Sequence, residues 1–146
     1  MVYIDTSVLA AYYCPETFSA KAEQGILTAP HPAISWLVEV EMSSALQGKV
    51  LRGEIEEADR TKILAQFKKH IEEGCYEILP VNRMHYELAR EWIGLFSVPL
   101  RTLDALHLAI CYASEVTLMT ADQGLIKAAR HLDVPLVPCG DVSCES

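Results

Sequence analysis

Apolar and polar positions along the chain form two kinds of pattern, which predict strands and helices in alternation. Short runs rich in β-branched and aromatic residues predict strands at residues 2–4, 31–35, 76–81, 116–119 and 135–138. Longer segments in which apolar side chains recur every three or four residues predict helices at residues 8–13, 16–27, 36–51, 54–73, 83–96, 102–114 and 120–132. Strands that alternate with helices form parallel sheets with right-handed crossovers and helices on both faces. We therefore predict an α/β fold, a three-layer sandwich with a central, mostly parallel five-stranded sheet.

Three of the predicted elements have a distinctive character. Residues 102–114 carry few polar side chains, so we expect this helix to be buried on most sides. Residues 54–73 place an apolar stripe opposite charged side chains, which suits either a clamp for a partner or a simple packing element. Prolines in residues 135–138 predict that this last strand lies at the edge of the sheet.

The composition predicts a single domain. With 146 residues the chain is long enough for one hydrophobic core, so we expect a domain over residues 1–140 followed by a frayed tail at 141–146. Hydrophobic residues make up 51% of the chain and the mean hydropathy is +0.16, which is high for a small protein. A partner or a second copy of the chain would cover surplus apolar surface of this kind.

The sequence has no pattern typical of a membrane span or a secretion signal. There is no apolar run of the length that spans a membrane, and no basic segment precedes an apolar one at the N-terminus. The five cysteines are scattered and odd in number, which is typical of reduced thiols. We expect a cytoplasmic protein without a membrane partner.

The net charge of −8 argues at first against a nucleic-acid partner, because phosphate binding normally requires a basic surface. Two bound divalent cations would halve that charge and concentrate the neutralisation at one place. The bulk charge therefore does not decide the class of substrate.

Three aspartates occur where a strand or loop meets a helix. Asp5 follows the strand at 2–4, and Asp104 and Asp122 each follow a threonine two residues earlier. Each one alone is explained by helix capping or by the helix dipole, and Thr120 with Gln123 fits a capping box. Together they fall at the edge of a parallel sheet where ligands bind, which favours a shared site.

A fourth acid comes from the helix at residues 36–51. Glu39 and Glu41 lie about 200° apart around that helix, so only one of them can face the sheet edge. Small or apolar helical neighbours favour Glu41, whereas Glu39 suits a solvated position near the helix start.

Four carboxylates in one place would repel one another and raise one another's pKa. Hard divalent cations such as Mg²⁺ or Mn²⁺ relieve this repulsion because they bind oxygen ligands. The chain has no histidine and cysteine cluster of the zinc type. A cation held by carboxylates can activate water and neutralise a phosphodiester oxyanion, which is the chemistry of a metal-dependent nuclease.

These motifs, in this order, resemble those of PIN-domain nucleases. The matching segments are Ile4-Asp5-Thr6-Ser7, Ser35 with Glu41, Thr102-Leu103-Asp104-Ala105-Leu106-His107-Leu108-Ala109, and Thr120-Ala121-Asp122. The likeness extends from Val2 to about Val137 and is greatest to small bacterial toxins of the VapC type.

The resemblance implies a PIN-like sandwich and a Mg²⁺- or Mn²⁺-dependent endoribonuclease, usually a homodimer and inhibited by a small antitoxin. It implies that Asp5, Glu41, Asp104 and Asp122 are the catalytic, metal-binding acids. Ser7 and Thr120 would be hydroxyls that support the metal or its water.

Two other side chains lie near these motifs. Arg101 is a candidate contact for a substrate phosphate, although a single exposed cation is more often simply solvated. His107, one helical turn after Asp104, is a weaker candidate ligand, because a histidine on so apolar a helix is more often a paired core residue.

Two alternatives stay open at this point. Asp5 after the first strand is also where an aspartyl-phosphate phosphatase has its nucleophile, although position 7 is serine rather than a second aspartate. In a non-catalytic binding module with the same fold, the acids would only cap helices.

Overall fold

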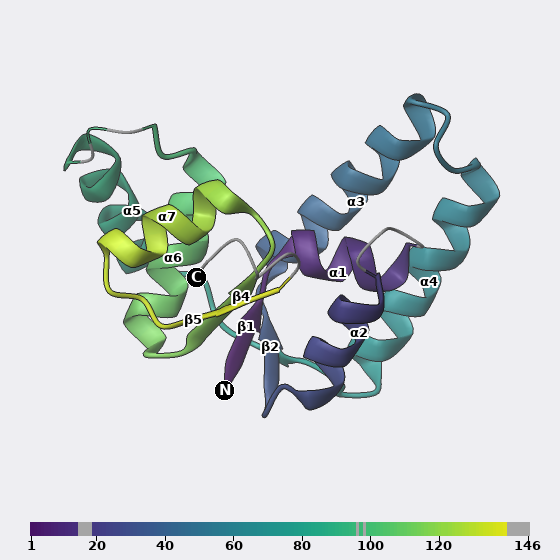
Figure 1. Ribbon diagram of the computed structural model, residues 1–146, viewed down its shortest axis with the longest axis horizontal. Coiled ribbons are helices and arrows are strands. Elements are labelled where there is room, and N and C mark those ends of the chain that lie inside the picture. Colours follow the sequence, from purple (N-terminus) through teal and green to yellow (C-terminus); the bar gives the residue numbers. More distant parts are fainter. Residues whose placement is uncertain (15–18, 96, 98, 140–146) are drawn as a thin grey trace.

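A five-stranded parallel sheet forms the centre of the molecule in the computed structural model, which describes residues 1–14, 19–95, 97 and 99–139 (Figure 1). Its strands are β1 (Val2–Ile4), β2 (Pro32–Ile34), β3 (Glu77–Ile78), β4 (Thr117–Thr120) and β5 (Leu136–Pro138). They lie in the order β3-β2-β1-β4-β5, and each neighbouring pair is parallel. The sheet is therefore wholly parallel, where the sequence predicted a mostly parallel one, and β5 is at the edge as expected.

Seven helices cover the sheet in the described part of the chain. They are α1 (Thr6–Tyr13), α2 (Ser19–Thr28), α3 (Trp36–Leu51), α4 (Glu57–Glu72), α5 (Arg83–Leu95), α6 (Thr102–Ser114) and α7 (Gln123–His131). The strand order reverses between β1 and β4, so right-handed crossovers direct α1 to α4 and α5 to α7 to opposite faces. Figure 1 shows these two groups on either side of the strands. The predicted three-layer α/β architecture is confirmed.

The core explains the sequence pattern of the central strands. All three residues of β1 are buried, and Leu118 in β4 is fully enclosed. Strands covered on both faces need apolar side chains on both, which is why β1 is a continuous apolar run rather than an alternating one. The helix α6 is buried over most of its length, as its sequence predicted.

Several predicted boundaries differ from the structure. The helix predicted from Thr120 begins at Gln123, because Thr120 pairs with β5 as the last residue of β4 and Asp122 is the N-cap. The predicted capping box of Thr120 with Gln123 is therefore wrong. The predicted strand at 76–81 is reduced to β3, Glu77–Ile78.

The helix predicted at 54–73 is α4, and it begins three residues later than predicted, at Glu57. Gly53, with a φ of 75°, ends the segment after α3, and a capping box of Glu56 with Asp59 starts α4 at Glu57. Residues 15–18, at the start of the helix predicted for 16–27, and the predicted tail at 141–146 lie outside the described residues. Within the described residues, no helix has the length and apolar character that a membrane span requires.

Shortening a buried side chain of the central sheet tests the packing of this core. Leu118→Ala is expected to lower the free energy of unfolding by about 2–5 kcal/mol, because it leaves a cavity where no solvent reaches. Leu51→Ala, at a position 76% exposed, is the control and should change it by less than about 0.5 kcal/mol. Urea unfolding followed by circular dichroism measures both; equal midpoints for the two variants would contradict the packing described here.

Candidate active site

The four predicted acids line one cavity at the carboxyl ends of β1 and β4, where the strand order reverses. Such reversal points are the usual ligand sites of open parallel sheets. The cavity has a volume of about 380 Å³, and its lining residues are Asp5, Thr6, Ser7, Glu41, Arg101, Asp104, His107 and Asp122. Four segments that are distant in sequence therefore supply carboxylates to one space.

Asp5 is the most buried of the four, with 5% of its surface exposed. It is the N-cap of α1, and its Oδ1 accepts hydrogen bonds from the backbone N–H groups of Ser7 (2.9 Å) and Val8 (3.4 Å). The Ser7 hydroxyl also donates to Oδ1 at 2.6 Å, and the Thr120 hydroxyl donates to Oδ2 at 2.7 Å. Burial raises the pKa of Asp5, and the bonds from Ser7 and Thr120 oppose that rise.

Ser7 and Thr120 connect the start of α1 to the end of β4. The Ala121 N–H donates to the Ser7 hydroxyl, and the Asp122 N–H donates to the Thr120 hydroxyl, each at 3.0 Å. Thr120 is fully buried, whereas Ser7 lines the cavity. Both hydroxyls therefore hold Asp5 in place, and their contact with a metal, its water or a substrate stays a prediction.

Glu41 enters the cavity from α3. Its Oε1 accepts hydrogen bonds from the Thr6 hydroxyl at 2.9 Å and from Nε2 of His107. Burial acts to raise the pKa of Glu41, but the bonds from His107 and Thr6 outweigh it and the pKa is lowered. Glu39 is exposed and lines a different groove, so the two glutamates diverge around the helix as their spacing required.

Arg101 bridges the remaining two acids. Its Nε donates to Oδ2 of Asp104 at 3.0 Å, and its Nη2 donates to Oδ2 of Asp122 at 3.1 Å. Asp122 also caps α7, where its Oδ1 accepts from the Gly124 N–H at 3.2 Å. Burial raises the pKa of Asp104, and the Arg101 charge and hydrogen bond oppose that rise. Arg101 was predicted to meet a substrate phosphate; here it neutralises part of the acidic cavity.

The donor set fits a hard divalent cation. The acids offer only oxygen ligands, which Mg²⁺ and Mn²⁺ prefer. Among the residues described, no three side chains of ligand type already converge on one point, and Arg101 shares two of the carboxylates. An entering cation would therefore take over the role of counter-charge that Arg101 fills.

From the sequence we assigned no role to Tyr3, and Thr6 and Ser35 entered only as members of the matching motifs. His107 was favoured as a paired core residue. His107 is 1% exposed and hydrogen-bonded to Tyr3 and Glu41, as that interpretation expects, but Glu41 is one of the acids of the cavity. Its position three residues after Asp104 was the available signal, because i and i+3 share a helix face. The bonds that join Tyr3 to Ser35 and to His107 gave no such signal, since these residues lie in different elements.

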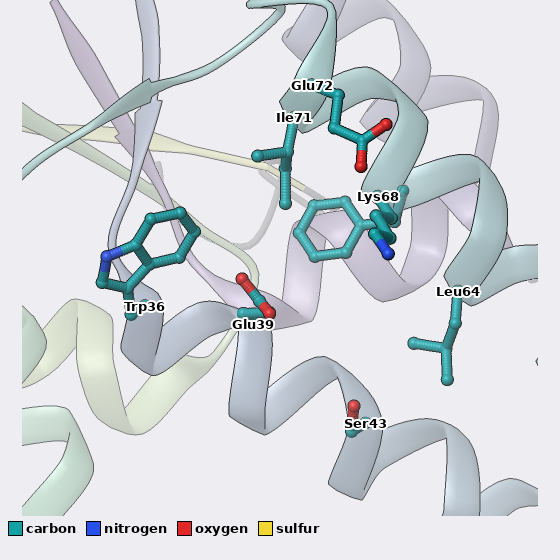
Figure 2. Close-up of a pocket in the computed structure, with 8 residues that line it drawn as sticks. Trp36, Glu39, Ser43, Leu64, Lys68, Ile71 and Glu72 are labelled. Carbon is teal, nitrogen blue, oxygen red and sulfur yellow. The ribbon is translucent and has the colours of Figure 1, made fainter.

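A second groove lies between α3 and α4, away from the acids. Figure 2 shows it with Trp36 and Glu39 from α3 facing Leu64, Lys68 and Ile71 from α4. Its volume is about 360 Å³, and Trp36 is 53% exposed there. The same α4 also buries Phe67 in the core, so this helix both packs against α3 and borders an open apolar groove.

Comparisons with solved structures show the same fold. VapC20 of Mycobacterium tuberculosis, described as a Sarcin-Ricin loop cleaving toxin, is 16% identical with a TM-score of 0.71, over 88% of this chain and 95% of that one. FitAcB from Neisseria gonorrhoeae is 16% identical with a TM-score of 0.69, over 93% and 96%. VapBC2 from Rickettsia felis, bound to a DNA fragment from its promoter, is 18% identical with a TM-score of 0.65, over 96% and 100%.

Sequence comparison identifies the family. A search of curated proteins found no significant match. The family model described as PIN domain matches residues 2–131, which is nearly the whole chain. The resemblance carried by the sequence motifs is thus confirmed, and the chain belongs to the PIN-domain family.

Proposed function

We propose that this protein is a Mg²⁺- or Mn²⁺-dependent endoribonuclease and the toxin of a type II toxin-antitoxin pair. One observation carries the proposal: Asp5, Glu41, Asp104 and Asp122 line a single cavity at the reversal point of the sheet. Proteins of the PIN family are generally nucleases, which supports hydrolysis of a phosphodiester.

In this proposal the four carboxylates hold the cation, which supplies charge neutralisation and a water of lowered pKa. Asp5 is fixed by Ser7 and Thr120, so its carboxylate is oriented before a cation binds. Arg101 is 75% exposed at its side chain and lies at the cavity, where it can move from the acids to a phosphate oxygen of RNA. In this proposal the Ser7 hydroxyl, which lines the cavity, contacts the metal's water or the substrate, and the buried Thr120 hydroxyl supports the metal through Asp5.

The partner part of the proposal is an antitoxin, with a second copy of the chain forming a homodimer. Solved structures of similar fold include toxin-antitoxin complexes from Klebsiella pneumoniae and from nontypeable Haemophilus influenzae. The apolar groove between α3 and α4 supports a protein partner, because open apolar surface of this kind is usually covered. A cytoplasmic location follows from the same proposal, since RNA and antitoxin are found there.

Replacement of one acid tests the chemistry. Glu41→Gln is expected to lower the rate of RNA cleavage by about a hundredfold or more. Mutation of a residue that only hydrogen-bonds to a metal ligand typically lowers activity by about 10–100-fold, and loss of the ligand itself should lower it at least as much. Glu39→Gln, on the same helix but outside the cavity, is the matched control and should cleave like the unchanged protein. Cleavage of labelled RNA is followed in Mg²⁺ or Mn²⁺ and in chelator.

Cleavage that persists in chelator would refute the metal-dependent mechanism. Sequencing of the cut ends adds an independent result, since attack by water leaves 5′-phosphates whereas attack by the 2′-hydroxyl leaves 5′-hydroxyls. Retention of phosphate by Asp5 without RNA cleavage would instead support the phosphatase alternative.

The burial of Asp104 beside other acids gives a prediction about stability. Because burial raises the pKa of Asp104 in the folded protein, its charge weakens folding above that pKa, and the loss is regained as pH falls through it. Asp104→Asn should therefore raise the melting temperature at pH 7 in chelator. In Mg²⁺ at one hundred times its dissociation constant, the unchanged protein should gain about 2.7 kcal/mol of stability, and the variant should gain less because it has lost one ligand.

Scanning calorimetry with and without Mg²⁺ measures both effects. Asp133→Asn is the control, because Asp133 is exposed, lies outside the cavity and has a left-handed backbone that asparagine tolerates. A melting temperature of Asp104→Asn below that of the unchanged protein in chelator would contradict the pKa direction. An unchanged curve for the natural protein in millimolar Mg²⁺ would contradict a shared cation site.

A further inference from the structure

A buried chain of side-chain hydrogen bonds ends at the cavity. The Ser35 hydroxyl lies 2.7 Å from the Tyr3 hydroxyl, which lies 2.7 Å from Nδ1 of His107, and Nε2 of His107 bonds Glu41. Ser35, Tyr3 and His107 are each at most 1% exposed. Burying three polar side chains in a core costs free energy unless each one is hydrogen-bonded. The three residues are therefore arranged so that each has a partner.

The Ser35 side chain takes part in these hydrogen bonds and does not cap the helix that follows it. It is the N-cap of α3, where a serine side chain normally accepts a hydrogen bond from the helix backbone, yet its side chain makes no capping bond. Its hydroxyl is directed to Tyr3 instead. Ser35 thus bonds to Tyr3 in the series of hydrogen bonds that leads to Glu41, and it does not cap α3 with its side chain.

The chemistry of the groups sets the direction of the last bond. An ionised carboxylate only accepts, so Nε2 of His107 carries the hydrogen and donates it to Oε1 of Glu41. Thr6 donates to the same oxygen. Among the hydrogen bonds of the described residues, none reaches Oε2, which leaves that oxygen to a ligand.

We propose that His107, held by Tyr3 and Ser35, is a positioning residue that fixes the Glu41 carboxylate so that one of its oxygens is free to bind the divalent cation. This rests on the proposed function, because it concerns the same cation. A histidine that only filled the core would need partners, but it would not need its partner to be an acid of the cavity.

Metal binding without RNA tests the proposal. Isothermal calorimetry with Mn²⁺ compares the natural protein with Tyr3→Phe, His107→Leu and His107→Gln, whose melting curves verify that they fold. His107→Leu should weaken binding by about tenfold or more, and Tyr3→Phe by a smaller factor. His107→Gln should recover part of the loss, because its amide N–H can still donate to Glu41.

A double-mutant comparison separates positioning from general damage to the core. If Tyr3 acts through Glu41, Tyr3→Phe should weaken Mn²⁺ binding in the natural protein but not in a Glu41→Gln background. Equal losses in both backgrounds would overturn the proposal. If the natural protein binds Mn²⁺ and Tyr3→Phe and His107→Leu bind it equally well, the positioning role fails while the proposed function stands. If the natural protein binds no Mn²⁺, both fail.

Nitrogen NMR of the imidazole gives a second result that is independent of metal. We expect a protonated Nε2 on His107 whose signal shifts in Glu41→Gln, because its acceptor changes from a carboxylate to an amide. A His107 signal that is insensitive to Glu41→Gln would overturn the proposed bond.

Discussion

A carboxylate with 5% of its surface exposed is tolerated only when hydrogen bonds replace the water it has lost, and Asp5 has four donors. Three belong to the start of α1 and one belongs to the end of β4. The Asp5 N–H also donates to the Met119 carbonyl at 3.1 Å. One side chain therefore starts a helix and joins the two strands at which the sheet order reverses. In the sequence, helix capping and a place in a shared cavity look like alternative roles for Asp5. In the structure, the bonds that cap α1 also orient its carboxylate in the cavity.

The other acids show how a fold tolerates negative charges brought close together. Glu41 is stabilised by donors from Thr6 and His107, and its pKa is lowered despite burial. Asp104 depends on the charge of Arg101, and its pKa is still raised because burial dominates. Such a cavity has a cost in stability that a bound cation would remove. Asp5 and Asp104, whose pKa values burial raises, are thus acids that stability alone would not favour.

The sequence predicted the architecture well because that depends on local patterns. The apolar run of β1 and the apolar helix α6 gave the layers, and the prolines near Leu136 gave the edge strand. Boundaries were less accurate, since Thr120 has equally good local grounds to cap a helix or to end a strand, and only its pairing with β5 decides.

For the site, the sequence could name acids at strand ends but not their partners. Asp5 and Asp122 were visible because parallel strands end at a common edge. The bonds of Tyr3 with His107 and of Thr6 with Glu41 join residues 104 and 35 positions apart, and no spacing rule reaches so far. The bridging role of Arg101 was likewise hidden, because its contact with Asp122 depends on how α6 and β4 meet.

The cavity consequently has two unlike halves. Asp5 and Glu41 are held by groups that are buried or partly buried, so each keeps its orientation whether or not a ligand is present. Asp104 and Asp122 share one arginine whose side chain is 75% exposed, and an exposed ion pair contributes little to stability. The other oxygen of Asp122 accepts from the Gly124 N–H at the start of α7. The Arg101 bonds are therefore the ones that a cation or a phosphate can replace at small cost. A cavity with two firmly held carboxylates, and two whose contact with Arg101 is easily exchanged, combines a stable fold with room for a new charged group.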